Sequence, residues 1–352
     1  MYSEDTLQCP LWGSKSIIIL VIASLLLAGC SMKPTAFGDV QQIVVFADDS
    51  DWYKTADSVC EAFEQIIETP QYEKAFTVLH PPLDSFNSYK RKRMMLLIGT
   101  LESKGVIGDL LNRSLTDANR NAIRNEEKYA FQQRDVWATE QYMMILAAPT
   151  TDELVKRIQE NKDTIFRIMN NEANELMGKQ LYDRGEQLKF SDELMKQFNF
   201  MVRVQHDYFM HPRPENKIVV FRRYNPDRVL TVHWVDTTEV YEIPDSWILK
   251  KREVIGNIAM DNRQINPNSI TIKKTNFNDY VAKEIRGLWQ QNERHIGGPF
   301  ILYSFFDENT NRIYIIDLTV FAPEKIGEKA PLLRQLDIMA KTFKTSVKTD
   351  AH

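Results

Sequence analysis

Phe300-Ile-Leu-Tyr-Ser-Phe-Phe306 and Arg312-Ile-Tyr-Ile-Ile-Asp-Leu-Thr-Val-Phe321 are the two stretches that decide the fold. Both are rich in the β-branched and aromatic residues that favour strands. The segment between them, 307–311, reads Asp-Glu-Asn-Thr-Asn, and such short polar side chains favour turns. The sequence therefore predicts an antiparallel hairpin, followed by a closing helix that begins near Pro331.

Helix-type and strand-type patterns are interspersed over the rest of the chain. Thr150 and Glu153 have the spacing of a capping box, and an apolar stripe continues from there to about Leu181. We therefore predict an α+β fold, with antiparallel sheets and helices packed on one side. The two halves, 42–184 and 185–345, are each compatible with an α/β sandwich.

The N-terminal segment is the clearest targeting signal. Ile17 to Leu27 is apolar or small throughout, which is the length of a signal-peptide core and too short to span a bilayer as a helix. Its end, Leu27-Ala-Gly-Cys30, resembles the lipobox of bacterial lipoproteins. That resemblance implies cleavage before Cys30 and acylation of this cysteine, which gives a signal peptide at 1–29 and a lipidated tether at 30–41. Several acyl chains together hold a protein stably on a membrane.

The residues around Cys30 also bear on location. Ser31 follows the cysteine, where lipoproteins of the inner membrane often carry Asp, so the resemblance implies the outer membrane. No acidic run follows, which favours the periplasmic face over the cell surface. An ordinary hydrophobic segment with a chance cysteine stays open as the alternative, because the acidic Glu4 and Asp5 are unusual in a signal peptide. The membrane, reached through Cys30, is thus the first predicted partner.

Composition excludes some classes of function. The 352 residues carry 44 Lys and Arg against 48 Asp and Glu, and this near balance argues against a nucleic-acid partner. The basic run at 90–93 is typical of a solvated helix end, with binding of anionic lipid heads as the alternative. Once Cys9 leaves with the signal peptide and Cys30 is acylated, Cys60 has no partner for a disulfide. We expect Cys60 to be a buried structural thiol.

Sequence motifs for catalysis or metal binding are missing. The six histidines are scattered, and the spacing of His206 and His211 places them apart on either a helix or a strand. The sequence contains no phosphate loop, no nucleophile elbow and no paired metal-ligand motif. We therefore predict no metal, no cofactor and no catalytic residue.

One cluster in the last third of the chain is a candidate site. Asp317 lies in an otherwise apolar strand, where a buried carboxylate needs a partner. Arg286, within Glu284-Ile-Arg286-Gly-Leu-Trp289, is the predicted partner. Gly298 is expected at a pocket rim beside Trp289. Glu284, Arg286, Trp289, Gly298 and Asp317 are thus either a ligand site or part of a sheet-stitching ion pair.

Ten short segments stand out together: Asp49–Trp52, Val136–Ala138, Glu160–Lys162, Arg286–Trp289, Gly297–Phe300, Tyr303-Ser304, Asn311-Arg312, Asp317, Phe321–Pro323 and Leu333–Leu336. Together they resemble a known family, DUF4837, which is an uncharacterised lipoprotein family typical of Bacteroidota. The resemblance covers most of the mature chain, and it is sharpest from Glu284 to Leu336. It implies the compartment and one shared fold, and no activity comes with it. The closing hairpin and helix also resemble the end of the PsbP-type α/β sandwich, whose members are mostly binding modules.

Two functions remain open at this level. The first is a membrane-anchored envelope lipoprotein that serves as a binding or structural module, with an envelope protein as its partner. The second is an envelope hydrolase or other enzyme with a site near Arg286 and Asp317. A polar cleft at these residues would favour the enzyme, and a packed ion pair would favour the binding module.

Overall fold

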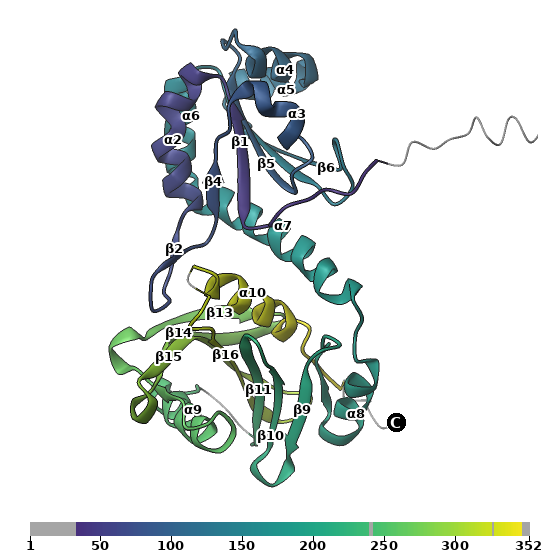
Figure 1. Ribbon diagram of the computed structural model, residues 1–352, viewed down its shortest axis with the longest axis vertical. Helices are drawn as coiled ribbons and strands as arrows, with labels where there is room; N and C mark the ends of the chain where they lie inside the picture. Colours follow the sequence, from purple (N-terminus) through teal and green to yellow (C-terminus); the bar gives the residue numbers. More distant parts are fainter. Residues whose placement is uncertain (1–32, 239–241, 326, 347–352) are drawn as a thin grey trace, which may run out of the picture.

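The computed structural model describes residues 33–238, 242–325 and 327–346. Cys30, the lipobox and the predicted signal peptide lie outside the described residues. Figure 1 shows two sheets, one above the other, with the long helix α7 (Lys162–Asp183) running from the upper sheet towards the lower one. Helix α10 (Lys329–Ala340) lies between the two sheets, although it is formed by the end of the chain.

The N-terminal domain is built on a five-stranded sheet with the order β4-β1-β5-β7-β6. The first four strands of this order run parallel, and β6 pairs antiparallel with β7. Parallel strands need helical crossovers, which the intervening helices supply. The strands are β1 (Gln42–Ala47), β4 (Thr77–Leu79), β5 (Met94–Thr100), β6 (Ala130–Arg134) and β7 (Tyr142–Ala148), with a separate short hairpin of β2 (Ile66–Ile67) and β3 (Glu73–Lys74).

Helices cover both faces of this sheet. Val45 of β1 belongs to the core under α2, α6 and α7, whereas its neighbour Val44 belongs to the core under α3, α4 and α5. Strands buried on both faces read as unbroken apolar runs, as β1 and β5 do. The α+β class is confirmed, but this sheet is mainly parallel and covered on two sides, unlike the expected antiparallel sheet. The helices are α2 (Asp49–Phe63), α3 (Phe86–Tyr89), α4 (Val106–Ser114), α5 (Asp117–Arg124) and α6 (Thr151–Glu160).

The predicted capping box is present, but the helix that it begins is shorter than expected. The amide of Glu153 donates to Oγ1 of Thr150 at 3.4 Å. The helical stretch is then divided at Asn161, which separates α6 from α7. The side-chain amide of Asn161 donates to the carbonyl of Arg157 at 2.9 Å. The backbone amide of Asn161 donates to the same carbonyl at 3.2 Å, so the side chain competes with the backbone for this acceptor at the break.

The C-terminal domain is built on an eight-stranded antiparallel sheet with the order β12-β14-β15-β16-β11-β10-β9, and β13 also pairs with β14. The predicted hairpin is confirmed, with Phe306 opposite Ile313 and Phe300 opposite Thr319. Its strands are β9 (Phe209–Arg213), β10 (Ile218–Arg223), β11 (Asp227–Asp236), β12 (Gln264–Ile265), β13 (Thr271–Phe277), β14 (Tyr280–Gln291), β15 (Ile296–Asp307) and β16 (Arg312–Phe321), and a short pair is formed by β8 (Phe200–Met201) and β17 (Lys344–Thr345).

This second sheet also carries helices on both faces. Helices α8 (Leu188–Phe198) and α10 cover one face, and α9 (Asp245–Ala259) covers the other. The prediction of helices on one side is therefore wrong here as well. Each face is apolar along the central strands, so both need cover from water. No helix within the described ranges is long and apolar enough to cross a bilayer.

The α10 helix joins the two domains through polar contacts. Nη1 of Arg334 donates to the side-chain oxygens of Asn170 and Asn174 on α7, at 2.6 Å each. The amide of Ala330 donates to Oε2 of Glu73 in the N-terminal domain at 2.7 Å. The guanidinium of Arg334 also lies 5.2 Å from the ring centre of Phe76. One helix of the C-terminal domain thus bonds to two separate elements of the N-terminal one.

The segment after the predicted acylation site lies along the edge of the N-terminal domain. The amide of Ala36 donates to the carbonyl of Thr139 at 2.8 Å, and the amide of Phe37 donates to the carbonyl of Arg91 at 3.1 Å. Nη2 of Arg93 donates to the carbonyl of Ala36 at 2.9 Å. Part of the expected tether is therefore bonded to the domain.

Candidate functional site

The predicted site residues lie on two opposite faces of the C-terminal sheet. Arg286 is opposite Ile301, which in turn is opposite Leu318. Asp317 is opposite Leu302 instead, one residue out of phase. Since side chains alternate between faces along a strand, Arg286 faces α10 and Asp317 faces α9. The predicted pair of Arg286 with Asp317 is therefore wrong.

Asp317 is paired with an arginine from helix α9. Its Oδ2 lies 3.0 Å from Nε of Arg252, and neither side chain is exposed. The guanidinium lies 4.6 Å from the ring centre of Phe300 and donates from Nη1 to the carbonyl of Arg263 at 2.5 Å. Burial raises the pKa of Asp317 and lowers the pKa of Arg252, because both charged forms lose hydration. No solvent reaches this pair, so it holds α9 on the sheet.

Trp289 and Gly298 meet on the same face as Asp317. The indole Nε1 of Trp289 donates to the carbonyl of Val320 at 3.1 Å. A Cβ atom on Gly298 would lie 2.0 Å from that carbonyl oxygen and 2.9 Å from the indole nitrogen. The absence of a side chain at 298 is thus what lets Trp289 reach across to β16. These two residues therefore pack against each other and connect β14 and β15 to β16.

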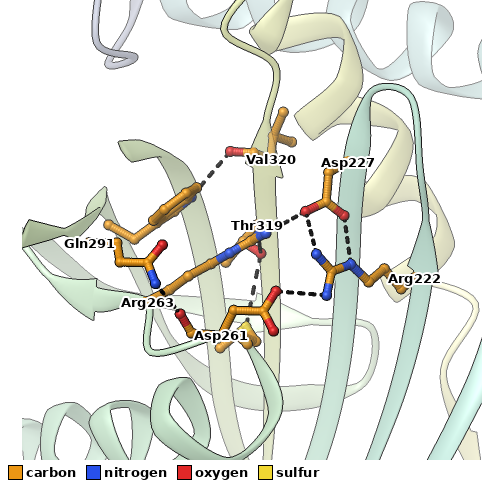
Figure 2. Close-up of polar contacts among 9 residues, drawn as sticks. Arg222, Asp227, Asp261, Arg263, Gln291, Thr319 and Val320 are labelled. Atoms are coloured by element: carbon orange, nitrogen blue, oxygen red, sulfur yellow. Dashed lines mark hydrogen bonds and ion pairs between the residues drawn. The ribbon is translucent and has the colours of Figure 1, made fainter. Parts of the chain in front are cut away.

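Arg222, Arg263, Asp227 and Asp261 form a polar network next to Trp289 (Figure 2). Asp227 accepts from Nε and Nη2 of Arg222, both at 2.9 Å, and also from Arg263. Nη1 of Arg222 donates to Asp261 at 2.8 Å. Nη1 of Arg263 donates to Oγ1 of Thr319 at 2.9 Å. Each charged side chain of this network has an opposite charge beside it. None of the four charges of the network is therefore unpaired and available to bind a substrate.

Glu284 and Arg286 pair with each other on the α10 face. Oε1 of Glu284 lies 2.5 Å from Nε of Arg286 and 3.1 Å from Nζ of Lys273. Burial opposes ionisation of Glu284, but the charges of these two partners hold its pKa below the usual value. Arg286, Arg334 and Asp337 share the wall of a small cavity of about 80 Å³ at the domain junction. These residues are therefore part of the contact between domains.

Three larger hollows open at the surface of the described part of the chain. One of about 820 Å³ lies beside the β13–β14 and β15–β16 turns, and it is lined by both acidic and lysine side chains. One of about 270 Å³ lies next to the network of Figure 2. A third, of about 730 Å³, lies between the two domains, and three arginines line it. We call this third hollow, lined by α7, α10, residues 205–207 and the adjoining ends of β10 and β11, the interdomain cleft.

The sequence analysis missed the buried arginines that organise these contacts. Arg252 lies between Ile248 and Ile255 on one face of α9, and all three are buried. Arg228 similarly lies in line with the buried Leu230 and Val232 along β11. A charged residue on an apolar stripe is a signal that needs a partner, and this signal is readable in the sequence.

Cysteine and metal-ligand chemistry do not add a site within the described ranges. No group of three or more His, Cys, Asp or Glu side chains is placed there to hold a metal ion. Cys60 is half-buried, so it is less enclosed than expected. Burial and the nearby Glu64 raise the pKa of this thiol, which disfavours the reactive thiolate.

Few solved structures are similar to the chain, and only distantly. The Ran-binding protein Mog1p of Saccharomyces cerevisiae is 9% identical, with a TM-score of 0.30, and the match covers 42% of this chain and 90% of that one. LpqN of Mycobacterium tuberculosis, involved in cell envelope biogenesis, is also 9% identical, with a TM-score of 0.28 over 42% of this chain and 83% of that one. No curated protein matches the chain. Likeness at this level implies no shared activity.

Two family profiles match consecutive parts of the sequence. DUF4837 matches residues 187–342, which includes the region where the resemblance is sharpest. The segments Asp49–Trp52, Val136–Ala138 and Glu160–Lys162 fall instead within a match to a second family, DUF8532, so the expected extent of DUF4837 was too long. The chain therefore carries a DUF8532 domain at residues 36–182 followed by a DUF4837 domain at residues 187–342, and both are domains of unknown function.

Proposed function

We propose that this chain is a lipid-anchored envelope protein of the outer membrane that faces the periplasm and works as a binding module. The observation that carries the binding role is that Asp317 and Arg286 are each occupied by an ion pair within the chain, with Arg252 and Glu284 respectively. The alternative of a hydrolase near Arg286 and Asp317 is not supported, because an enzyme would need both side chains to reach one substrate.

The position of the anchor supports contact with the membrane. Only residues 31–33 separate Cys30 from Pro34, whose carbonyl accepts from the amide of Thr139 at 2.9 Å. Four residue steps span at most about 14 Å. An acylated Cys30 would thus hold the exposed Arg91 and the half-buried Lys90 and Lys92 near the lipid headgroups, where positive charge is favoured. Arg93 is buried and paired with Glu140.

Fractionation of cells tests the anchor directly. We expect Cys30→Ala to leave the fold intact and to move the protein from the membrane to the soluble fraction, whereas Cys60→Ala stays in the membrane. A Cys30→Ala protein that remains membrane-bound at high salt would overturn the anchor.

In-cell crosslinking with mass spectrometry tests the binding role. We expect one dominant envelope protein to be captured by the anchored wild-type chain, and to be lost when residues on its contact surface are changed. If hydrolysis of an envelope substrate were found with the purified chain, the binding role would give way to an enzymatic one.

A further inference from the structure

The interdomain cleft has a wall from each domain. Helix α7 contributes Met177 and Gln180 from the DUF8532 side, and Arg223, Arg228 and Gln335 come from the DUF4837 side. Its volume of about 730 Å³ is within the range of small-molecule sites, which often lie between domains. Figure 1 shows α7 and α10 side by side at this junction.

Arg228 is the unusual residue of this wall. Only 2% of it is exposed, yet no carboxylate of the described residues forms an ion pair with it. Nη1 donates to the uncharged side-chain oxygen of Gln335, and Nε has no partner at all. A buried guanidinium is normally matched by an anion, because an isolated charge loses its hydration without compensation.

The neighbouring strand makes this site more positive. Arg223 lies directly opposite Arg228 in the β10–β11 pair. Like charges in directly opposite positions destabilise a sheet unless an anion lies between them. Asp207 pairs with Arg223 at 2.8 Å. The charge of Asp207 also acts on Arg228, but only from beyond ion-pair distance.

Unsatisfied acceptors lie in the same wall. Oε1 of Gln205 and Oδ1 of Asp207 are both buried and have no hydrogen-bond partner. Asp39 and Asp183 line the cleft as well and are exposed. Unsatisfied acceptors and acidic side chains thus surround Arg228, which has no ion pair among the described residues. This arrangement favours a ligand that carries hydrogen-bond donors beside its anionic group, over an ion with several negative charges.

We propose that the interdomain cleft binds a small ligand that places a carboxylate or phosphate group against Arg228 and hydroxyl or ammonium donors against Gln205 and Asp207. The anionic group supplies the missing partner of Arg228, and the donors satisfy the two buried oxygens. Charge-assisted hydrogen bonds of this kind are the strong ones, and the guanidinium fork suits both oxygen groups. This inference does not depend on the anchor.

Two matched probes separate carboxylate from phosphate. β-Alanine and phosphoethanolamine each carry an ammonium two carbons from the anionic group or its ester oxygen. Each is titrated into the mature chain in a non-ionic detergent at constant ionic strength, with sodium chloride as the blank. The readout is the Nε–H resonance of Arg228 in arginine-labelled protein, assigned by its loss in Arg228→Lys. We expect a saturable shift with one or both probes and none with chloride.

Variants at the two ends of the contact test the site. Arg228→Lys should weaken binding about tenfold as followed by intrinsic fluorescence, because lysine lacks the fork. Gln335→Glu should abolish binding and raise the melting temperature, because it supplies Arg228 with an anion from within the chain. This variant keeps the test valid even where a change at 228 impairs folding. Arg294→Lys, at an exposed arginine elsewhere on the same domain, should bind as wild type.

The outcomes decide the proposal. A shift with phosphoethanolamine alone assigns a phosphate ligand, one with β-alanine alone assigns a carboxylate ligand, and one with both supports the shared chemistry. The proposal is overturned if neither probe shifts the Arg228 resonance. Unchanged binding in a folded Gln335→Glu variant would also overturn it.

Discussion

Nε of Arg252 lies 3.0 Å from Oδ2 of Asp317, and both side chains are completely enclosed between α9 and the eight-stranded sheet. Asp317 is the one carboxylate of strand β16, and it lies where Arg252 of helix α9 supplies the opposite charge. The pair therefore fixes the position of α9 on the sheet, because any shift of the helix along the sheet would separate two buried charges.

Arg252→Met is expected to lower the free energy of unfolding of the C-terminal domain by about 3–5 kcal/mol, since it leaves the Asp317 charge buried and alone. Urea titration followed by tryptophan fluorescence measures the change. The double variant Arg252→Met/Asp317→Leu should regain most of the loss, whereas Arg286→Met, at a partly exposed side chain, should cost less. A double variant as unstable as Arg252→Met would contradict this role of the pair.

Gly298→Ala should destabilise the same domain by about 1–3 kcal/mol, because the added methyl group would push β16 away from Trp289. The melting temperature measures it. Gly178→Ala is the matched control, because in α7 the nearest atom to a new Cβ is 3.5 Å away. There alanine should stabilise by about 0.5–1 kcal/mol. Equal effects of the two changes would show that close packing at 298 is not responsible.

Stability should fall between pH 6.5 and about 4 because of His233. Burial lowers the pKa of His233 to about 4, and Nδ1 lies 3.0 Å from the carbonyl oxygen of Lys217. The unfolded chain takes up a proton near pH 6.5, where the folded chain does not, so the contribution of the neutral ring is complete above that pH. It should decrease by roughly 3 kcal/mol as the pH falls to about 4.

Urea midpoints at several pH values in that range measure this dependence. His233→Asn keeps a donor near the carbonyl of Lys217 and cannot titrate, so its slope should be smaller. His211→Asn, at an exposed position on β9, should keep the wild-type slope. A wild-type slope in His233→Asn would assign the pH dependence to other groups.

Arg334→Met should weaken the junction between the two domains, because it removes the bonds to Asn170 and Asn174. Only 9% of Arg334 is exposed, and this burial lowers its pKa to about 10. We expect calorimetry to resolve two unfolding transitions in place of one, with trypsin cleaving faster near 184–189. Arg294→Met should change neither. A single transition in Arg334→Met would mean that the remaining contacts, among them the bond from Ala330 to Glu73, couple the domains without Arg334.

Local patterns predicted two features correctly, one in each domain. The hairpin of β15 and β16 and the cap at Thr150 each depend on residues close together in the sequence. The parallel sheet of the N-terminal domain was missed, because a short apolar run such as β1 has the same composition in a parallel or an antiparallel pair. Only the order of pairing distinguishes them, and that order is a tertiary property.

The candidate site failed for a related reason. Alternation along a strand places Glu284 with Arg286 on one side of β14, and Asp317 on the other side of β16 from Leu318. Whether Arg286 and Asp317 share a face depends on the register through β15, where a shift of one residue exchanges the two faces. The true partner, Arg252, comes from a helix that sequence spacing does not connect to the strand.

The position of α10 has a consequence for how the chain folds during its synthesis. The helix that bonds to Asn170 and to Glu73 begins at Lys329, so it is synthesised after almost every other element. Until it arrives, the apolar surfaces that it covers on both domains face water. A product truncated before residue 329 would therefore leave core surface of both domains uncovered, and proteases would meet an unfinished chain with its interior exposed.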